Sequence, residues 1–397
     1  MILFPKLNSK TNKMALFILF MLSFFGIVIF NIVGFHYVTS AIILWIAFRY
    51  RKEKIVYKPF IYLYFVGFVI SCIYSQLYNG QPFWLTMSFC SGYVGLLFAL
   101  FLIQKNLSSK ELINMFVFIA VIYVILYIIQ WIVFPINIVS AAANQNPESD
   151  TYRLRIPGSI CSFVLFYYGV NKVLLKDKLR GFLYCCLGFM PIIIMGFRTL
   201  TAITVVSTFL MTATVTTNIK KTLVYFILFC GVAVAFSNVP IVSDKIQEMQ
   251  DRQERETDSG TENNIRLIAY QYLSGQYFVK PGEKIFGAGI PTLATKYTKD
   301  LNSLIDNYHI YWNDIGLVGL SFLIGIPTVL MLCFIYLLCA WRCKSPDLQF
   351  IRFTAITMVF GSAMTTMELY RSGNILLFSI LLCIEYQRNQ ELKMINS

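Results

Sequence analysis

The sequence predicts an all-α, polytopic integral membrane protein with about 12 transmembrane helices and one long extracytoplasmic loop between helices 9 and 10. Composition is the first reason, because 57% of the 397 residues are hydrophobic and only 13% are charged, against roughly 25% charged residues in a soluble domain. The second reason is the apolar runs, which are about 16 to 24 residues long and do not alternate. Helices of that length cross about 30 Å of hydrocarbon and satisfy their own backbone hydrogen bonds, so barrel strands are excluded.

The predicted spans divide the chain into three parts. Residues 1–240 hold nine spans, residues 241–311 form the polar loop, and residues 312–397 hold three spans and a cytoplasmic tail. We expect the first span to be a retained helix, because its apolar run is longer than that of a signal peptide and no small-residue cleavage site follows. The spans are predicted at residues 14–33, 35–49, 58–78, 83–104, 112–134, 158–175, 181–197, 199–217, 222–240, 313–340, 349–367 and 373–386.

Charge sets the expected orientation. Most of the 33 lysine and arginine residues fall before the first span or in connections on that same side, and cytoplasmic connections carry such an excess. The long loop has 8 basic against 10 acidic residues. Both termini are therefore predicted to be cytoplasmic and the long loop to lie outside. The net charge of +13 follows from this bias toward the lipid headgroups, so it does not indicate nucleic acid as a partner.

The cysteine and glycine patterns argue against metals and cofactors. The 10 cysteines lie almost entirely in apolar spans, none lies in the long loop, and no CxxC pair of the kind that binds zinc is present. No glycine-rich phosphate loop or nucleotide motif is present. We therefore expect neither a metal nor a cofactor.

The long loop is expected to be folded rather than disordered. Ser243 is a candidate cap for a charged helix that runs to about Glu256. Asn263 or Asn264 is a candidate cap for a second helix, which carries Ile265 on its apolar face. Glycine-rich turns follow, and a last amphipathic piece enters the membrane at Trp312.

Two arginines stand out as candidate anion ligands. Arg198 lies between two apolar runs, where it is either a snorkelling interfacial residue or a ligand that faces an outward cavity. Arg266 lies early in the second predicted loop helix, and on its own it is best explained as a solvated surface charge.

Arg153 and Arg155 lie in a short connection on the same predicted side, against the general charge bias. Arginine has planar, paired donors that match phosphate oxygens. Together with Arg198 and Arg266, these residues suit the diphosphate of a lipid carrier.

Histidine and carboxylate residues offer a base. His309 stands at the predicted membrane entrance, where it is either an interfacial residue or a general acid or base near neutral pH. Asp306 and Asp314 flank it and are alternative bases. Glu368 and Arg371 are spaced as an ion pair on one helix face, and His36 is expected to have a structural role in a tight turn.

Three local patterns resemble the superfamily of O-antigen polymerases and O-antigen ligases of bacterial surface polysaccharides. The stretch from Gly196 to Thr199, followed by an apolar helix, looks like the Ser-Arg-Gly or Ser-Arg-Thr hairpin of that family. Arg266, ahead of the Gly-Ala-Gly turn at 287–289, looks like its loop arginine, and the run 309–319 looks like its segment before a Gly-Leu-x-Gly-Leu helix start. Phe197 and Ile310 depart from the ligase pattern and favour the polymerase branch.

The resemblance implies transfer of a growing glycan from undecaprenyl diphosphate to a hydroxyl of a lipid-linked repeat unit in O-antigen, capsule or exopolysaccharide. It implies the bacterial inner membrane as location, and a chain-length regulator and a flippase as further partners. Arg198 and Arg266, assisted by Arg153 or Arg155, would bind the diphosphate in place of a metal, and His309 or Asp306 would activate the acceptor.

Two other functions stay open. A ligase would transfer finished polymer to a terminal acceptor. A flippase or transporter would carry lipid-linked oligosaccharides, but we expect midplane charges in such a protein, and the spans here hold almost none.

Overall fold

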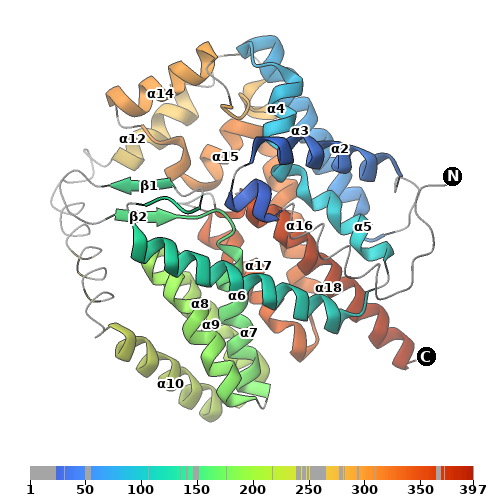
Figure 1. The fold of residues 1–397 in the computed structure, drawn as a ribbon, viewed down its shortest axis with the longest axis vertical. Helices are drawn as coiled ribbons and strands as arrows, with labels where there is room; N and C mark the ends of the chain where they lie inside the picture. Colours follow the sequence, from blue (N-terminus) through green and yellow to red (C-terminus); the bar gives the residue numbers. More distant parts are fainter. Residues whose placement is uncertain are drawn as a thin grey trace.

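A computed structural model gives the fold (Figure 1). It describes residues 24–396 except 31, 50–54, 106, 135, 140–141, 146–151, 176, 217, 238–242, 244–246, 248–249, 251–264, 277–279, 281, 293–294, 309, 364–367 and 371. In the described residues the chain is helical apart from one two-stranded hairpin. The predicted helical class is confirmed.

Three helices of the described part are long and apolar enough to cross a membrane, namely α3 (Lys58–Asn79), α6 (Ser109–Val133) and α9 (Arg198–Thr216). Shorter apolar helices include α7 (Ile160–Leu175) and α16 (Ile326–Arg342). The apolar helices expected of a membrane protein are therefore present, while the number of about 12 spans stays a prediction.

Where predicted and observed helices agree, capping residues, proline and glycine mark the helix ends. Ser108 caps α6 by accepting from the Glu111 amide at 3.3 Å, and the Glu111 carboxylate accepts from the Ser108 amide. α3 begins with a proline in its first turn and ends at Gly80, whose φ of 67° favours glycine. Three further helices match predicted spans, namely α2 (Val33–Arg49), α8 (Lys178–Ile194) and α10 (Ile219–Ser237).

The predicted span at 83–104 is wrong as a single helix. It consists of α4 (Phe83–Phe89), the 3₁₀ helix η2 (Ser91–Leu97) and α5 (Phe98–Gln104). η2 packs against the last helix, α18 (Ser372–Asn396). A Cβ on Gly95 would lie 2.9 Å from the Cα of Leu376, so the two backbones are in direct contact here. This close approach accompanies the tighter winding of η2.

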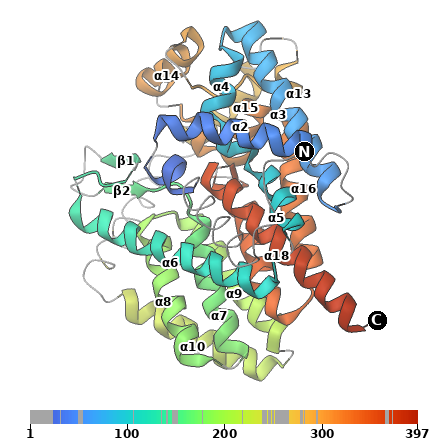
Figure 2. The same ribbon diagram turned by 45° about the vertical axis from the view of Figure 1, so that its right-hand side comes forward.

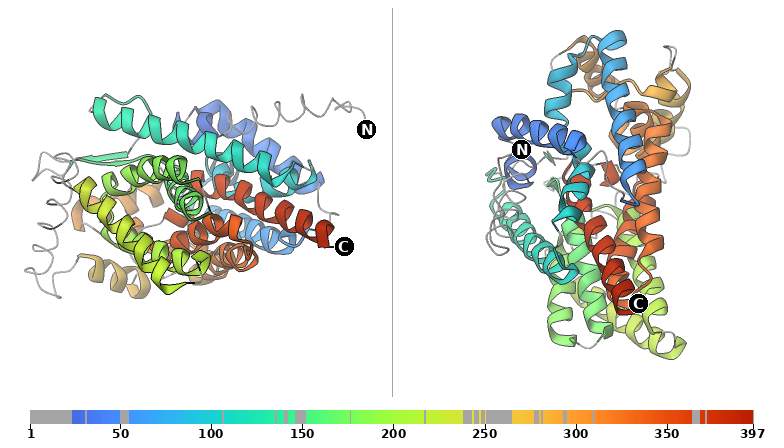
Figure 3. Two further views of the ribbon diagram at one scale, coloured as in Figure 1. Left: turned by 90° about the horizontal axis from the view of Figure 1, so that it is seen from below. Right: turned by 90° about the vertical axis from the view of Figure 1, so that its right-hand side faces the viewer.

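The predicted span at 313–340 is also wrong as a single helix. After the 3₁₀ turn η4 (Trp312–Asp314) it divides into α15 (Gly316–Ile324) and α16 at Gly325, which has a φ of 84°. A left-handed residue interrupts an α-helix and leaves carbonyls without helical partners. Figure 3 shows that α16, after this break, runs beside α3, and the two helices are in contact.

A segment of the long loop satisfies the carbonyls freed at the break. The Ala288 amide donates to the Phe322 carbonyl at 2.7 Å, and the Gly289 amide donates to the Leu323 carbonyl at 2.9 Å. Gly287 has a φ of 79° and Gly289 one of 99°, which confirms the predicted glycine turn. The loop therefore forms part of the membrane-helix framework, which no property of the 313–340 run alone predicts.

The same loop segment is attached to the turn after α3. The Asn79 side chain donates to the Ala288 carbonyl at 2.6 Å, and the Gln81 side chain donates to the Ile290 carbonyl at 3.1 Å. Lys280 donates to the Tyr78 carbonyl at 2.7 Å. These bonds fix the second half of the loop to the helix bundle.

The loop is folded in its described part, as expected. It contains α12 (Ile265–Gln271), the π-helix η3 (Tyr272–Gln276), α13 (Glu283–Phe286) and α14 (Lys296–Tyr308). The helix predicted from Ser243 to Glu256 and the caps at Asn263 and Asn264 lie almost entirely outside the described residues.

The connection that carries Arg153 and Arg155 is a strand rather than an irregular loop. β1 (Ala142–Gln145) pairs antiparallel with β2 (Tyr152–Arg155), with Ala142 opposite Arg155. Figures 1 and 2 show this hairpin between the loop helices and the end of α6. Pairing satisfies the backbone groups of a segment that lies next to apolar helices.

The last two predicted spans have different lengths from those expected. α17 (Gln349–Gly361) is shorter than 349–367 and is followed by the 3₁₀ turn η6 (Glu368–Tyr370). α18 extends ten residues past the predicted end at 386, to Asn396. The extension is polar, and its contacts join many helix ends.

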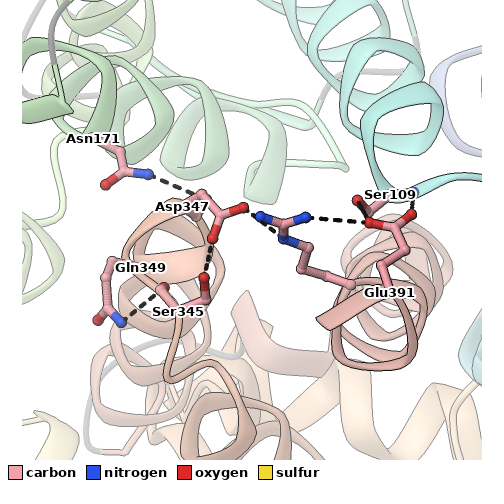
Figure 4. A network of polar contacts seen from close by, with 7 residues as sticks. Ser109, Asn171, Ser345, Asp347, Gln349 and Glu391 are labelled. Atoms are coloured by element: carbon pink, nitrogen blue, oxygen red, sulfur yellow. Dashed lines mark hydrogen bonds and ion pairs between the residues drawn. The ribbon is translucent and has the colours of Figure 1, made fainter. Parts of the chain in front are cut away.

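Figure 4 shows the network at the C-terminal part of α18. Arg388 Nε lies 2.8 Å from a carboxylate oxygen of Asp347, and Arg388 also pairs with Glu391 at 3.4 Å. The Ser109 amide and hydroxyl donate to Glu391 at 2.9 and 2.7 Å, and the Asn171 side chain donates to the Asp347 carbonyl at 3.2 Å. One polar network thus joins the start of α6, the end of α7 and the start of α17.

A second group of contacts lies one turn earlier on α18. Glu385 is fully buried and accepts from the hydroxyl of Tyr57, from Arg342 Nε at 2.8 Å and from the Asn389 amide. These residues bring the start of α3 and the end of α16 to the same place. All the helix ends joined by α18 were predicted to share one side of the membrane, and we call their meeting place the C-terminal junction.

Candidate functional site

The turn between α17 and α18 lies at the other end of these helices and contains a buried carboxylate. Glu368 opens η6 with only 1% of its surface exposed. A buried carboxylate is costly unless hydrogen bonds compensate the lost hydration. The surroundings of Glu368 supply such bonds.

Three buried side chains are joined to one another by hydrogen bonds. The Ser159 hydroxyl donates to Glu368 Oε2, and the Asn374 amide donates to Glu368 Oε2 at 3.4 Å and to Ser159 Oγ at 2.9 Å. Asn374 also donates to the Glu368 carbonyl at 2.6 Å and accepts from the Ile160 amide at 2.9 Å. We call Ser159, Glu368 and Asn374 the Glu368 cluster. It joins the starts of α7 and α18 to the turn after α17.

The strand β2 leads directly into the Glu368 cluster. Gly158 has a φ of 98° and turns the chain from β2 to Ser159, and a Cβ there would meet the ring of Phe24 at 2.9 Å. Two tyrosines one turn apart on α6 hold the strand from its other side. Tyr127 donates to the Leu154 carbonyl at 2.7 Å, and Tyr123 donates to the Ile156 carbonyl at 2.9 Å.

The starts of α9 and α15 pack on the same turn. The Leu200 side chain of α9 packs directly on Gly361 at the end of α17, since a Cβ on Gly361 would lie 2.3 Å from Leu200 Cδ1. Gly316, with a φ of 55°, lies against the backbone of Ser362, and the Leu317 amide donates to the Ala363 carbonyl at 3.4 Å. We call the Glu368 cluster and these packed helix starts the outer junction.

The outer junction receives two of the predicted anion-binding segments. Arg198 is the first residue of α9, two positions before Leu200, and is half-buried. Arg153 and Arg155 have their backbone in β2, four to six residues before Ser159, and their side chains lie outside the described part of the structure. Arg266 is the second residue of α12 and half-buried, and its helix reaches α15 through η3.

The predicted bases lie on the approach to α15. Asp306 is exposed on α14, Asp314 is half-buried in η4, and His309 lies outside the described residues.

The sequence also singled out Glu368, Arg371 and His36. Glu368 is in a 3₁₀ turn with the partners given above, its proposed ion-pair partner Arg371 lies outside the described residues, and His36 is buried in α2, consistent with a structural role.

Sequence reasoning missed Ser159, Asn374 and the role of Glu368. All three are polar residues next to or inside apolar runs, and so are Tyr123 and Tyr127. Polar residues on one face of an apolar helix mark a face turned toward protein rather than lipid. The i, i+4 spacing of the two tyrosines was therefore an available signal for the β2 contact.

The arrangement is chemically suited to an anion at the outer junction. The first turn of α9 presents amides without partners inside the helix and the positive end of the helix dipole, and Arg198 adds a full charge to it. In the described residues no group of three or more histidine, cysteine, aspartate or glutamate side chains is placed to hold a metal ion.

Neither the family models nor the curated protein sequences contain a match to this chain.

Proposed function

We propose that this chain is a metal-independent polysaccharide polymerase of the bacterial inner membrane, with about 12 spans and both termini in the cytoplasm. It transfers a growing glycan from undecaprenyl diphosphate to a hydroxyl of a lipid-linked repeat unit. A chain-length regulator and a flippase are the expected protein partners. The product class is an O-antigen, a capsule or an exopolysaccharide.

One observation carries the proposal. Arg198 begins a helix that packs on the same turn as the Ser159 end of the arginine-bearing strand β2. Two basic segments, separated in sequence by the helix hairpin of α7 and α8, thus converge on the outer junction. This convergence is what a ligand with two adjacent phosphates requires, because each phosphate needs its own donors.

The transfer breaks the bond between the anomeric carbon of the donor glycan and its phosphate oxygen, and forms a bond from that carbon to the acceptor oxygen. The hydroxyl proton passes to a base, for which His309 and Asp306 are the candidates. The leaving group is undecaprenyl diphosphate, and arginine side chains neutralise the charge that develops on it. Cleavage of the activated bond between the glycan and the phosphate drives the step, and the diphosphate itself leaves intact, so no nucleotide sugar is consumed.

The test replaces Arg266 by alanine in cells that display the polymer. We expect the ladder of chain lengths to disappear while the amount of protein in the membrane stays normal. Lys284→Ala, on the short helix α13 of the same loop, is the matched control and should leave the ladder intact. An unchanged ladder with Arg266→Ala would sink the proposed role.

A deletion strain distinguishes polymerase from ligase. Loss of a polymerase leaves single repeat units on the final acceptor, whereas loss of a ligase leaves finished polymer on the lipid carrier. We expect single repeat units.

A further inference from the structure

Glu368 is a buried carboxylate to which the transfer reaction gives no role. Its carboxylate is held by Ser159 and Asn374, and only 1% of its surface is exposed, so it is not placed to contact a glycan. A carboxylate close to a diphosphate site repels the diphosphate and weakens its binding. The presence of Glu368 therefore indicates a structural role for its hydrogen bonds. Its role depends on which segments its hydrogen bonds hold in place.

Its bonds hold the base of β2. Ser159 is four residues from Arg155, and the connecting backbone is fixed by the Tyr123 bond to Ile156 and by the Gly158 turn. Asn374 completes the link, because it accepts from the Ile160 amide and donates to the Glu368 carbonyl. The end of β2 is thereby tied to the turn after α17 rather than only to its own hairpin.

The other side of this turn carries Arg198. The Leu369 amide donates to Ser362 Oγ at 2.7 Å, so the Glu368 turn is attached to the end of α17. Leu200 of α9 packs on Gly361, one residue before Ser362. A continuous chain of contacts therefore runs from β2 through Glu368 to the start of α9.

Glu385 provides a comparison for this role. It is also a fully buried glutamate, but its partners are the cation Arg342 and side chains at helix ends of the C-terminal junction. Its contacts reach none of the arginines assigned to the ligand. Glu385 thus matches Glu368 in burial and differs in what it holds.

We propose that Glu368 is a positioning residue for diphosphate binding: through Ser159 and Asn374 it fixes β2, and so Arg153 and Arg155, relative to Arg198. This role rests on the proposed function, since it presumes that these arginines bind a diphosphate. The bonds of Glu368 are the link between β2 and the turn on which the start of α9 packs. Glutamine in its place keeps the shape and loses the charge-assisted bonds that hold the spacing.

The test is a titration of purified full-length protein in lipid nanodiscs with farnesyl diphosphate, and with farnesyl monophosphate as the comparison ligand. We expect Glu368→Gln to weaken diphosphate binding about tenfold, the effect of losing one charge-assisted hydrogen-bond set. Monophosphate binding should change much less, because a single phosphate does not need both arginine segments. If Glu368 served stability alone, Glu368→Gln protein that is still folded would keep the wild-type ratio of diphosphate affinity to monophosphate affinity.

Glu385→Gln is the matched control. Both variants should lower the melting temperature, and only Glu368→Gln should lower the preference for diphosphate over monophosphate. An equal loss of that preference in both variants would show a general effect of removing a buried charge and would overturn the proposal.

A double-mutant cycle locates the effect. In the Arg153→Ala/Arg155→Ala background, adding Glu368→Gln should cause little further loss of diphosphate affinity, because the arginines through which it acts are gone. A full additional tenfold loss in that background contradicts positioning of β2.

The outcomes separate the two proposals. If Arg198→Ala and Arg266→Ala weaken diphosphate binding while Glu368→Gln does not, the positioning role is wrong and the proposed function stands. If the wild-type protein shows no preference for diphosphate, the proposed function fails and the positioning role falls with it. Should Glu368→Gln not yield folded protein, Ser159→Ala removes one donor with less disturbance; a several-fold loss of diphosphate affinity supports the role, and unchanged affinity overturns it.

Discussion

The outer junction and the C-terminal junction each contain a buried glutamate, and they differ in which segments the glutamate's partners join. At the C-terminal junction Glu385 accepts from Arg342, and the surrounding bonds connect helix ends. At the outer junction Glu368 accepts from Ser159 and Asn374, and the arginines assigned to the ligand lie on α9 and β2. The two sites lie about 20 Å apart along α18.

The two junctions along α18 are therefore expected to have different roles. The contacts of the C-terminal junction connect helix ends and so stabilise the fold. The contacts of the outer junction connect the segments that carry the assigned arginines and so fix their positions. Substitutions at the two junctions should therefore affect different measurements, namely stability at one and polymer formation at the other.

The largest expected effect is on activity and tests the division directly. Arg198→Ala should reduce the rate of polymer formation by about 100-fold or more, the usual effect of removing a group that stabilises developing charge. Arg342→Ala at the C-terminal junction should lower the amount of folded protein but leave the rate per folded molecule nearly unchanged. Quantified ladders, normalised to protein in the membrane, measure both; equal losses per molecule would remove the distinction.

The next largest effect is on stability. Glu385→Ala leaves Arg342 without its buried partner, and breaking such a pair costs about 3–5 kcal/mol. Replacing Arg388, whose partners are partly exposed, should cost about 1 kcal/mol or less. Unfolding in mixed micelles by denaturant titration gives both values. A smaller cost for Glu385→Ala than for Arg388→Ala would contradict the account of the C-terminal junction.

The break between α15 and α16 offers a matched pair of glycines. Gly325→Ala should destabilise the protein by more than the roughly 1–2 kcal/mol of a left-handed alanine, because its ψ of 148° is in a region that only glycine readily adopts and because the new Cβ meets the Ile285 carbonyl. Gly80 is in the left-handed helical region with a φ of 67° and a ψ of 20°, and a Cβ there meets no atom within 4 Å, so Gly80→Ala should cost only the left-handed backbone term. Equal melting temperatures for the two variants would show that the loop does not hold the break.

The smallest expected effect is a dependence on pH at the C-terminal junction. Partial burial alone would raise the pKa of Glu391, but the Ser109 amide and hydroxyl together with Arg388 hold that pKa below its usual value. The lowered folded-state pKa means that the stabilisation is present above the unfolded pKa of about 4.3 and is lost as the pH falls through the folded value.

The melting temperature should therefore fall in the acid range, and Glu391→Gln should weaken this dependence while being less stable at pH 7. If the two proteins lose stability in parallel between pH 6 and 3, Glu391 does not contribute.

Hydropathy alone predicted the helical class and the positions of several helices, because apolar length is a local property. The boundaries of α3, α6 and α9 lie within a few residues of the predicted ones. Hydropathy did not predict the breaks at η2 and Gly325, where a distant backbone or a loop supplies the missing contacts. Those contacts are between residues far apart in sequence.

The candidate site was predicted in its parts but not in its arrangement. Arginine at 198 and in β2 could be recognised from charge against an apolar background. The bonds of Ser159 to Glu368 and to Asn374 could not, because they join positions more than 200 residues apart. Residue spacing on one helix suggested an ion pair between Glu368 and Arg371, but it carries no information on partners far apart in sequence.

The central claim is that this chain polymerises diphosphate-linked repeat units, and reconstitution tests it most directly. Purified protein in liposomes is given a single lipid-linked repeat unit, without nucleotide sugar and with a chelator of divalent metals, and the glycans are separated by length. The account predicts a ladder of polymers that Arg198→Ala abolishes and Glu385→Gln, in folded protein, retains. Repeat units that stay unextended in the presence of folded wild-type protein would contradict it.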